Sequence, residues 1–169
     1  GGYVAVVTSR YTMDSVKTAA REDIAATADL IAALRLPSRA FSRVAGTEVV
    51  TDLLIFRRRE ADVEVSVDTL DWINTEEVDL VHPASGDRDQ VPVNAYYVNN
   101  PQRVLGAMEL GRGLHASAQL TVTGATGHLL ADEIRSHLQP LIAAAVARGH
   151  ALTARRENLA VCAPTLFTP

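Results

Sequence analysis

The sequence predicts an α/β fold, because its first third alternates strand-like apolar runs with a helical pattern. Three runs rich in β-branched and aliphatic residues predict buried strands at Tyr3–Ser9, residues 30–36 and residues 48–58. Apolar residues four positions apart predict a helix that starts at Asp14, as its N-cap, and runs to Ala28. The chain has 169 residues, 47% of them hydrophobic and 21% charged, which suits one globular domain with at most a small appendage.

The rest of the chain predicts shorter elements and one long helix. Valines that alternate with acids predict a half-exposed strand, turn-forming residues predict a loop, and aliphatic residues at helical spacing predict a helix. Pro140 is expected to kink or split this helix and Gly149 to end it. Trp72 is expected to begin a segment that packs back on the sheet. The predicted elements are a strand at 63–67, a loop at 82–93, a short helix at 101–108, a strand at 118–123 and the long helix at 128–148.

Composition and charge exclude several classes of protein. No apolar run approaches the roughly 20 residues that span a bilayer, so we expect a cytoplasmic protein with no membrane partner. A single cysteine, Cys162, excludes an internal disulfide, and the histidines lack metal-ligand spacing, so no metal site is predicted. The net charge of −4 does not indicate a nucleic-acid partner. Lys17 is the only lysine, and this arginine richness reflects either genomic base composition or a surface that faces phosphates.

Four segments carry a resemblance to a known family. In chain order they read GGYVAVVTSRYTMD, ADLIAALRLPSRAF, GTEVVTDLLIFRRR and NAYYVNNPQRVLGAMELGRG. Together they resemble the second half of the catalytic domain of adenine-specific (N6) DNA methyltransferases. The resemblance is closest to the versions found in large phage and plasmid proteins that join a methylase to a helicase.

The resemblance implies a specific fold. Residues 1–60 would be the trailing half of the catalytic domain, with the last three strands of a class I S-adenosylmethionine-dependent methyltransferase (Rossmann-like) sheet. Residues 61–169 would form a C-terminal α+β extension with short strands and the kinked helix. In this family the strand at 48–58 pairs with Tyr3–Ser9 and with residues 30–36, and it runs antiparallel to both.

The resemblance also implies what the chain lacks. The glycine-rich turn that binds the methyl donor lies upstream in the family, and so does the Asn-Pro-Pro-aromatic motif that holds the adenine amino group. Asn100-Pro101 is followed by Gln102 and Arg103 and is not a copy of that motif. S-adenosylmethionine is therefore expected as a cofactor of an intact parent protein. For this chain alone we expect no cofactor, no catalytic residue and no methyl transfer.

The site residues implied by the resemblance belong to the side of the active site that holds the target base. Phe41 occupies the position whose ring stacks on the flipped adenine, although it could instead fill the core. Arg39 and Arg43 flank it and could reach DNA phosphates or simply lie in a solvated loop. Thr8 and Ser9 end the first strand on the carboxyl edge, where they could line the base pocket, although such residues are common at strand ends.

Partners follow from the missing upstream part. We expect two kinds of partner. One is DNA, bound through the parent protein, and the other is the upstream methyltransferase half or the helicase portion of a longer chain. The hydrophobic edge of Tyr3–Ser9 is expected to be covered by a homodimer, by strand swapping or by the C-terminal segment. Asp52, within an apolar strand, is expected to have a structural partner such as an arginine. The alternative function is a non-catalytic DNA-binding or assembly module.

Overall fold

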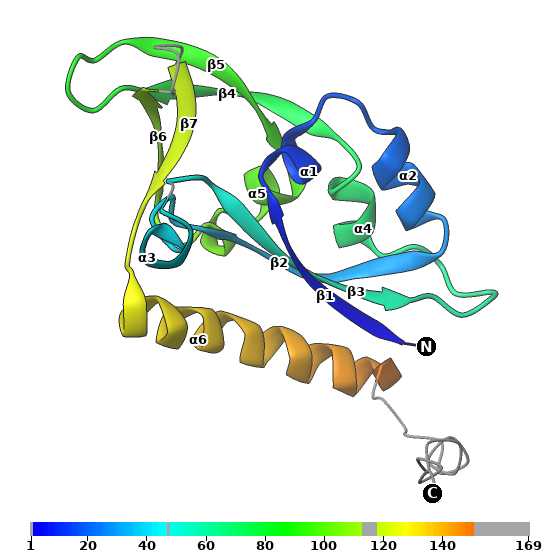
Figure 1. The fold of residues 1–169 in the computed structure, drawn as a ribbon. Coiled ribbons are helices and arrows are strands. Elements are labelled where there is room, and N and C mark those ends of the chain that lie inside the picture. The colour runs from blue at the N-terminus through cyan, green and yellow to red at the C-terminus, as the bar shows by residue number, and fades with distance from the viewer. Residues whose placement is uncertain (1, 47, 113–117, 151–169) are drawn as a thin grey trace, which may run out of the picture.

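The computed structural model describes residues 2–46, 48–112 and 118–150 (Figure 1). A three-stranded sheet lies at the centre of the molecule. The long helix α6 (Gly127–Ala145) runs along one face of this sheet, and most of the shorter helices lie on the opposite side (Figure 1). Both faces of the strands at residues 28–36 and 51–58 are therefore largely covered, which explains their continuous apolar runs.

The central sheet consists of β1 (Tyr3–Ser9), β2 (Ala28–Leu36) and β3 (Thr51–Arg58) in the order β1-β3-β2. Both pairings are antiparallel, and the register aligns Thr8 with Asp52 and Asp52 with Arg35. The three predicted strands and their neighbours are thereby confirmed, although the third strand starts at Thr51 rather than at residue 48. The predicted burial of Tyr3–Ser9 is wrong, because Val4 and Val7 of β1 are exposed.

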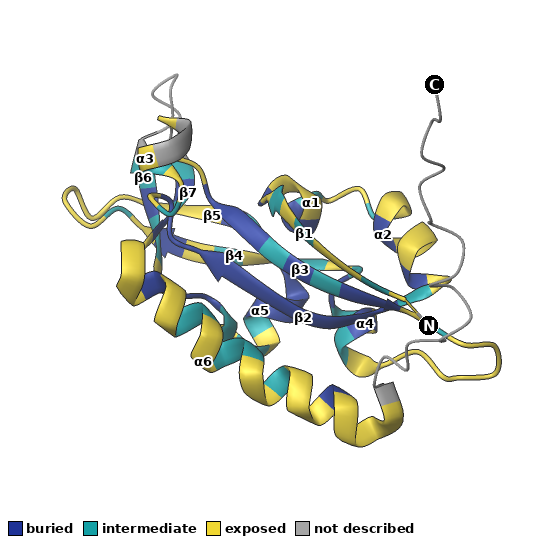
Figure 2. Cartoon of the chain, turned by 60° about the horizontal axis from the view of Figure 1, so that its bottom comes forward, coloured by how far each residue is buried: buried dark blue, intermediate teal, exposed yellow. Residues whose placement is uncertain are grey.

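The face of the sheet under α6 has its own apolar cluster. Leu34 and Leu36 of β2 contact Leu130 of α6, and the partly buried Ile134 and Leu138 extend this contact along the helix. Figure 2 shows β2 almost wholly buried, with α6 exposed on its outer side.

The opposite face carries the larger core. Leu54 and Phe56 of β3 pack against Trp72 and Tyr96. The Phe56 and Trp72 ring centroids lie 5.1 Å apart, and Trp72 is fully buried. This agrees with the prediction that Trp72 begins a segment that packs back on the sheet. The elements on this side include α1 (Tyr11–Asp14), α2 (Ala19–Ala25), α4 (Val67–Asp71) and α5 (Ala95–Asn99) (Figure 1).

The predicted fold class is wrong. The protein is α+β and contains three small antiparallel sheets instead of a partial Rossmann-like sheet. A Rossmann-like sheet requires adjacent parallel strands, whereas β3 separates β1 from β2 and opposes both. In the described ranges the parallel pairing is one isolated bridge, between Arg35 and Val104. The other two sheets are the hairpins β4 (Thr75–Val81) with β5 (Arg88–Asn94) and β6 (Ala107–Arg112) with β7 (Ala118–Thr123).

Two predictions before residue 70 are wrong. Of the helix expected from Asp14 to Ala28 only the short helix α2 forms, and Asp14 ends the preceding helix α1 instead of capping a helix. Its side chain turns inward to accept bonds from buried donors, which a helix N-cap could not do. The strand expected at 63–67 is replaced by an unpaired stretch and by α4, whose N-cap Ser66 accepts a hydrogen bond from the Thr69 backbone N–H.

The later predictions are partly right. Half of the loop expected at 82–93 is strand β5, and the short helix expected at 101–108 shrinks to a single 3₁₀ turn, η1 (Pro101–Arg103). The strand at 118–123 is confirmed as β7, and the long helix is confirmed as α6, which continues through Pro140 without splitting. Gly149 adopts φ +83°, the left-handed conformation expected where a helix ends. No helix in the described part of the chain is long and apolar enough to cross a membrane.

Candidate functional site

Phe41 lies in the loop that follows β2. After Leu36 the chain turns at Pro37, and Phe41 is the N-cap residue of the short helix α3 (Ser42–Ala45). Its side chain is 37% exposed, so the alternative in which the ring fills the core is wrong. The ring is therefore available to a ligand at the carboxyl end of β2.

Two hydrogen bonds tie this loop to the distant strand β7. Ser38 donates its backbone N–H to the Val122 carbonyl at 2.9 Å, and the Ser38 Oγ accepts the Val122 N–H at 2.9 Å. Gly124, just after β7, lies so close to the loop that a Cβ there would meet Pro37 Cγ at 2.8 Å and would overlap the Leu105 carbonyl oxygen. The start of the loop that carries Phe41 is thus held against the end of β7.

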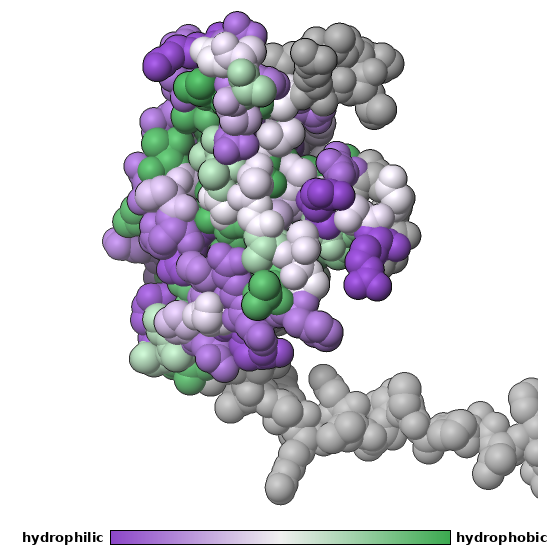
Figure 3. All heavy atoms as spheres, turned by 90° about the vertical axis from the view of Figure 1, so that its left-hand side faces the viewer, coloured by the Kyte–Doolittle hydropathy of each residue, from purple (hydrophilic) through white to green (hydrophobic). Residues whose placement is uncertain are grey.

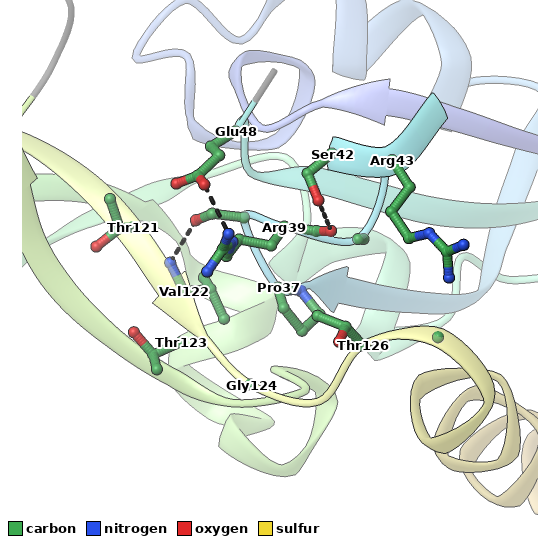
Figure 4. A pocket seen from close by; sticks show the side chains of 13 residues that line it. Pro37, Arg39, Ser42, Arg43, Glu48, Thr121, Val122, Thr123, Gly124 and Thr126 are labelled. Atoms are coloured by element: carbon green, nitrogen blue, oxygen red, sulfur yellow. Dashed lines mark hydrogen bonds and ion pairs between the residues drawn. The ribbon is translucent and has the colours of Figure 1, made fainter. Parts of the chain in front are cut away.

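An open groove of about 1030 Å³ lies between this loop and the turn from β7 into α6 (Figure 4). One wall contains Arg39 and Arg43, and the other contains Thr123 and Thr126. Thr126 precedes α6 and makes no capping hydrogen bond with its side chain. Figure 3 shows the side of the molecule where α3 and the start of α6 lie, and its hydrophobic patches there are small and scattered among polar residues. The groove therefore suits a polar ligand better than an apolar one.

The two arginines that the sequence singled out differ in their surroundings. Arg39 Nε lies 3.0 Å from Glu48 Oε1, and both side chains are largely exposed. Arg43 is exposed and makes no hydrogen bond or ion pair with any residue in the described ranges. Figure 4 shows its guanidinium extending along the groove, apart from the Arg39–Glu48 pair. Arg43 is consequently the freer of the two cations.

Thr8 and Ser9 lie at the same edge of the sheet as the Phe41 loop. Ser9 and Leu36 both pair with Thr51, so β1 and β2 end side by side across β3. Ser9 is exposed, whereas the Thr8 Oγ1 is buried without a hydrogen-bond partner. Neither residue lines the groove, so the structure places them near the strand ends without joining them to the two arginines.

A buried charge network lies directly beneath this edge. Arg35 donates to Asp52 through Nε at 2.9 Å and Nη2 at 3.1 Å, and Nη2 also donates to Asp14 at 2.8 Å. The Tyr97 hydroxyl donates to Asp52 at 2.9 Å, and its ring centroid lies 4.4 Å from the Arg35 guanidinium carbon. Asp14 also accepts the Asn94 backbone N–H at 3.0 Å. The partner expected for Asp52 is confirmed as Arg35.

Burial and the opposing charges set the protonation states in this network. Burial raises the pKa of Asp52, and the charge and hydrogen bonds of Arg35 oppose that rise. Burial opposes the charge of Arg35, yet Asp52 and Asp14 together raise its pKa above the usual value. Burial also raises the pKa of Tyr97 well above its usual value, so its hydroxyl remains a proton donor. The network is therefore a fixed structural element.

Sequence reasoning missed the extent of this network. Asp14, Arg35, Asp52 and Tyr97 come one from each of the four segments that carry the family resemblance. Each is a polar residue beside apolar neighbours, which is a signal that a buried partner exists. The pattern does not say which residues pair, because Asn94 and Tyr97 are far from the others in sequence.

Comparisons with family models, with curated proteins and with solved structures found no match. The family resemblance accordingly depends on the four sequence segments. In the described ranges, no group of three or more His, Cys, Asp or Glu side chains is placed to hold a metal ion.

Proposed function

We propose that this chain contributes the target-base side of an S-adenosylmethionine-dependent DNA adenine-N6 methyltransferase, with the methyl donor held by an upstream part of an intact parent. The observation that carries the proposal is the exposed ring of Phe41, fixed in a tethered loop at the carboxyl end of β2. By this proposal the chain binds and orients the base and does not itself transfer a methyl group.

The physical need for such a ring is clear. An enzyme that modifies a base within duplex DNA must rotate it out of the stack, which costs a few kcal/mol. An aromatic face offsets roughly 1–3 kcal/mol of that cost for each stacked base. Phe41 suits this role because its loop is anchored at Ser38, so little conformational entropy is lost when a base stacks on it.

Two further observations support the proposal. The strand order β1-β3-β2, with β3 antiparallel to both neighbours, is the order that the resemblance implies for these segments. The buried network also joins one residue from each of the four resembling segments. The segments therefore form one physical unit, as parts of a single site must.

The groove lies beside the loop that carries Phe41 and suits the DNA backbone, although Phe41 itself does not line it. Arg43 offers a guanidinium that has no ion pair within the described ranges, and Thr126 offers a hydroxyl group that makes no capping bond, whereas the Thr123 hydroxyl donates to Glu109 at 3.1 Å. The start of α6 also lies at the groove, and the positive end of its dipole favours a phosphate. Arg39 would join these groups once its exposed pair with Glu48 opens.

Binding of DNA with an extrahelical base tests the proposal. The probes are two short duplexes, one fully paired and one with 2-aminopurine opposite an abasic site, so that no target sequence needs to be known. We expect this chain to prefer the second duplex. Phe41→Ala should weaken binding to it by roughly 5- to 150-fold, whereas Phe41→Trp should retain it. Thermal unfolding of each variant serves as the control, because it separates a loss of base stacking from a loss of folding.

Two outcomes would count against the proposal. One is equal affinity for both duplexes, and the other is a Phe41→Ala effect that merely follows a loss of folding. Binding of S-adenosylmethionine to this chain with micromolar affinity, measured by calorimetry, would contradict the placement of the donor site upstream.

The alternative function, an assembly module, is favoured by one observation. β1 is an edge strand of the sheet, and its Val4 and Val7 side chains are 58% and 52% exposed. An edge of this kind readily pairs with another chain. Sedimentation analysis distinguishes the alternatives, since an assembly module should self-associate in the absence of DNA and should bind both duplexes equally.

A further inference from the structure

A second exposed aromatic residue lies at the same end of the sheet as Phe41. Tyr11 follows β1 by two residues and starts α1, and it is 59% exposed. Among the residues that the structure describes, Tyr11 and Phe41 are the two exposed aromatic side chains. Both come shortly after the carboxyl end of a strand, and these ends, at Ser9 and Leu36, pair with the same residue, Thr51.

The Tyr11 ring is held in place by a chain of buried groups. The guanidinium carbon of Arg10 lies 4.5 Å from the ring centroid, and Arg10 is 9% exposed. Arg10 Nη1 donates to Asp14 at 3.4 Å, and Asp14 is fixed in turn by Arg35 at 2.8 Å. One face of the ring is thus covered by a cation that the core anchors, and the ring as a whole remains largely open to solvent.

This arrangement differs from that of an ordinary surface tyrosine. Single apolar side chains on a protein surface are common and need no explanation. A ring whose orientation is fixed from beneath loses little entropy on binding, and proteins stack unpaired bases on such aromatic platforms.

We propose that Tyr11 is a second stacking platform, which holds an unpaired base of the DNA next to the target base. This inference rests on the proposed function, because it places a further contact on the same DNA. It assigns the carboxyl end of β1 to the DNA as well as the carboxyl end of β2. The tyrosine hydroxyl has no part in it, so phenylalanine should replace Tyr11 without loss.

The experiment uses this chain and a short single-stranded oligonucleotide with 2-aminopurine at its centre. Tyr11→Ala should weaken binding at least fivefold and should reduce the quenching of 2-aminopurine that stacking causes. Tyr11→Phe should bind like the native protein. Val67→Ala is the matched control, since Val67 is 71% exposed and starts α4, which contacts the opposite end of β2 through Thr69 and Leu30. Thermal unfolding of all variants reports any loss of folding.

The outcomes separate this inference from the proposed function. If Phe41→Ala weakens binding and Tyr11→Ala does not, the second platform is refuted and the proposed function stands. If Tyr11→Ala weakens binding and Phe41→Ala does not, the role of Phe41 is refuted instead. Absence of binding by the native chain refutes both, and an equal loss with Val67→Ala refutes a specific role for Tyr11.

Discussion

Replacing Arg35 with methionine would remove the cation at the centre of the buried network. The carboxylates of Asp14 and Asp52 would stay fully buried but would lose the three hydrogen bonds that the Arg35 guanidinium donates to them. Breaking a buried ion pair by removing one partner costs about 3–5 kcal/mol. That loss is a large part of the roughly 5–15 kcal/mol that stabilises a typical domain, so we expect Arg35→Met to lower the unfolding midpoint strongly.

The assay is urea unfolding followed by tryptophan fluorescence. Trp72 is the only tryptophan of the chain and is fully buried, so its emission reports the loss of the core. The matched control is Arg57→Met, because Arg57 is also buried but pairs with an exposed Glu60 at 3.1 Å. A pair of that kind contributes about 1 kcal/mol or less.

Two further measurements sharpen this prediction. Arg35→Met combined with Asp52→Leu should be more stable than Arg35→Met alone, since it removes a stranded carboxylate. Burial raises the pKa of Asp52. The loss of unfolding free energy caused by Arg35→Met should therefore be small in acid, where Asp52 is protonated, and should grow as pH rises through that pKa. If Arg35→Met is no more destabilising than Arg57→Met, the network does not stabilise the fold as described.

Three other changes address the groove and its walls. Glu48→Gln should raise DNA affinity a fewfold at low salt, because it frees Arg39 from its 3.0 Å ion pair, and unchanged anisotropy titrations would contradict this role. Arg43→Gln should lower the slope of log Kd against log salt by about one without shifting the melting temperature, and an unaltered slope would exclude a phosphate contact. Gly124→Ala should destabilise the protein by about 1–3 kcal/mol in thermal unfolding, because the new Cβ meets Pro37 and Leu105. Gly2→Ala, where no atom lies within 4 Å, is its control, and equal stability of the two variants would show that the loop adapts freely.

The central sheet was predictable because its signals are local. Continuous apolar runs identify β1, β2 and β3, and the family resemblance supplied their order. The hairpin β4–β5 was missed because Pro92 and Gly86 indicated a loop. In the structure Pro92 lies opposite Glu77 in a two-stranded sheet, where a residue without an N–H is tolerated, and Gly86 adopts φ +76° in the turn.

The site was predictable only in part. Phe41, Arg39 and Arg43 were identified from one loop, and the structure places the two arginines on one groove that Phe41 does not line. The second wall of that groove comes from β7 and α6, which local patterns cannot connect to Ser38. Asp14 was misassigned for the same reason, since its partners Arg35 and Asn94 are brought to it by tertiary folding.

The tether between Ser38 and Val122 limits how far the protein can be shortened. A piece that ended near residue 60 would keep β1, β2 and β3 but would lose the backbone groups that hold the start of the Phe41 loop. It would also lose Leu130, which covers Leu34 and Leu36. The smallest recombinant piece that presents the ring correctly must therefore extend into α6, and experiments on DNA recognition should begin from that length.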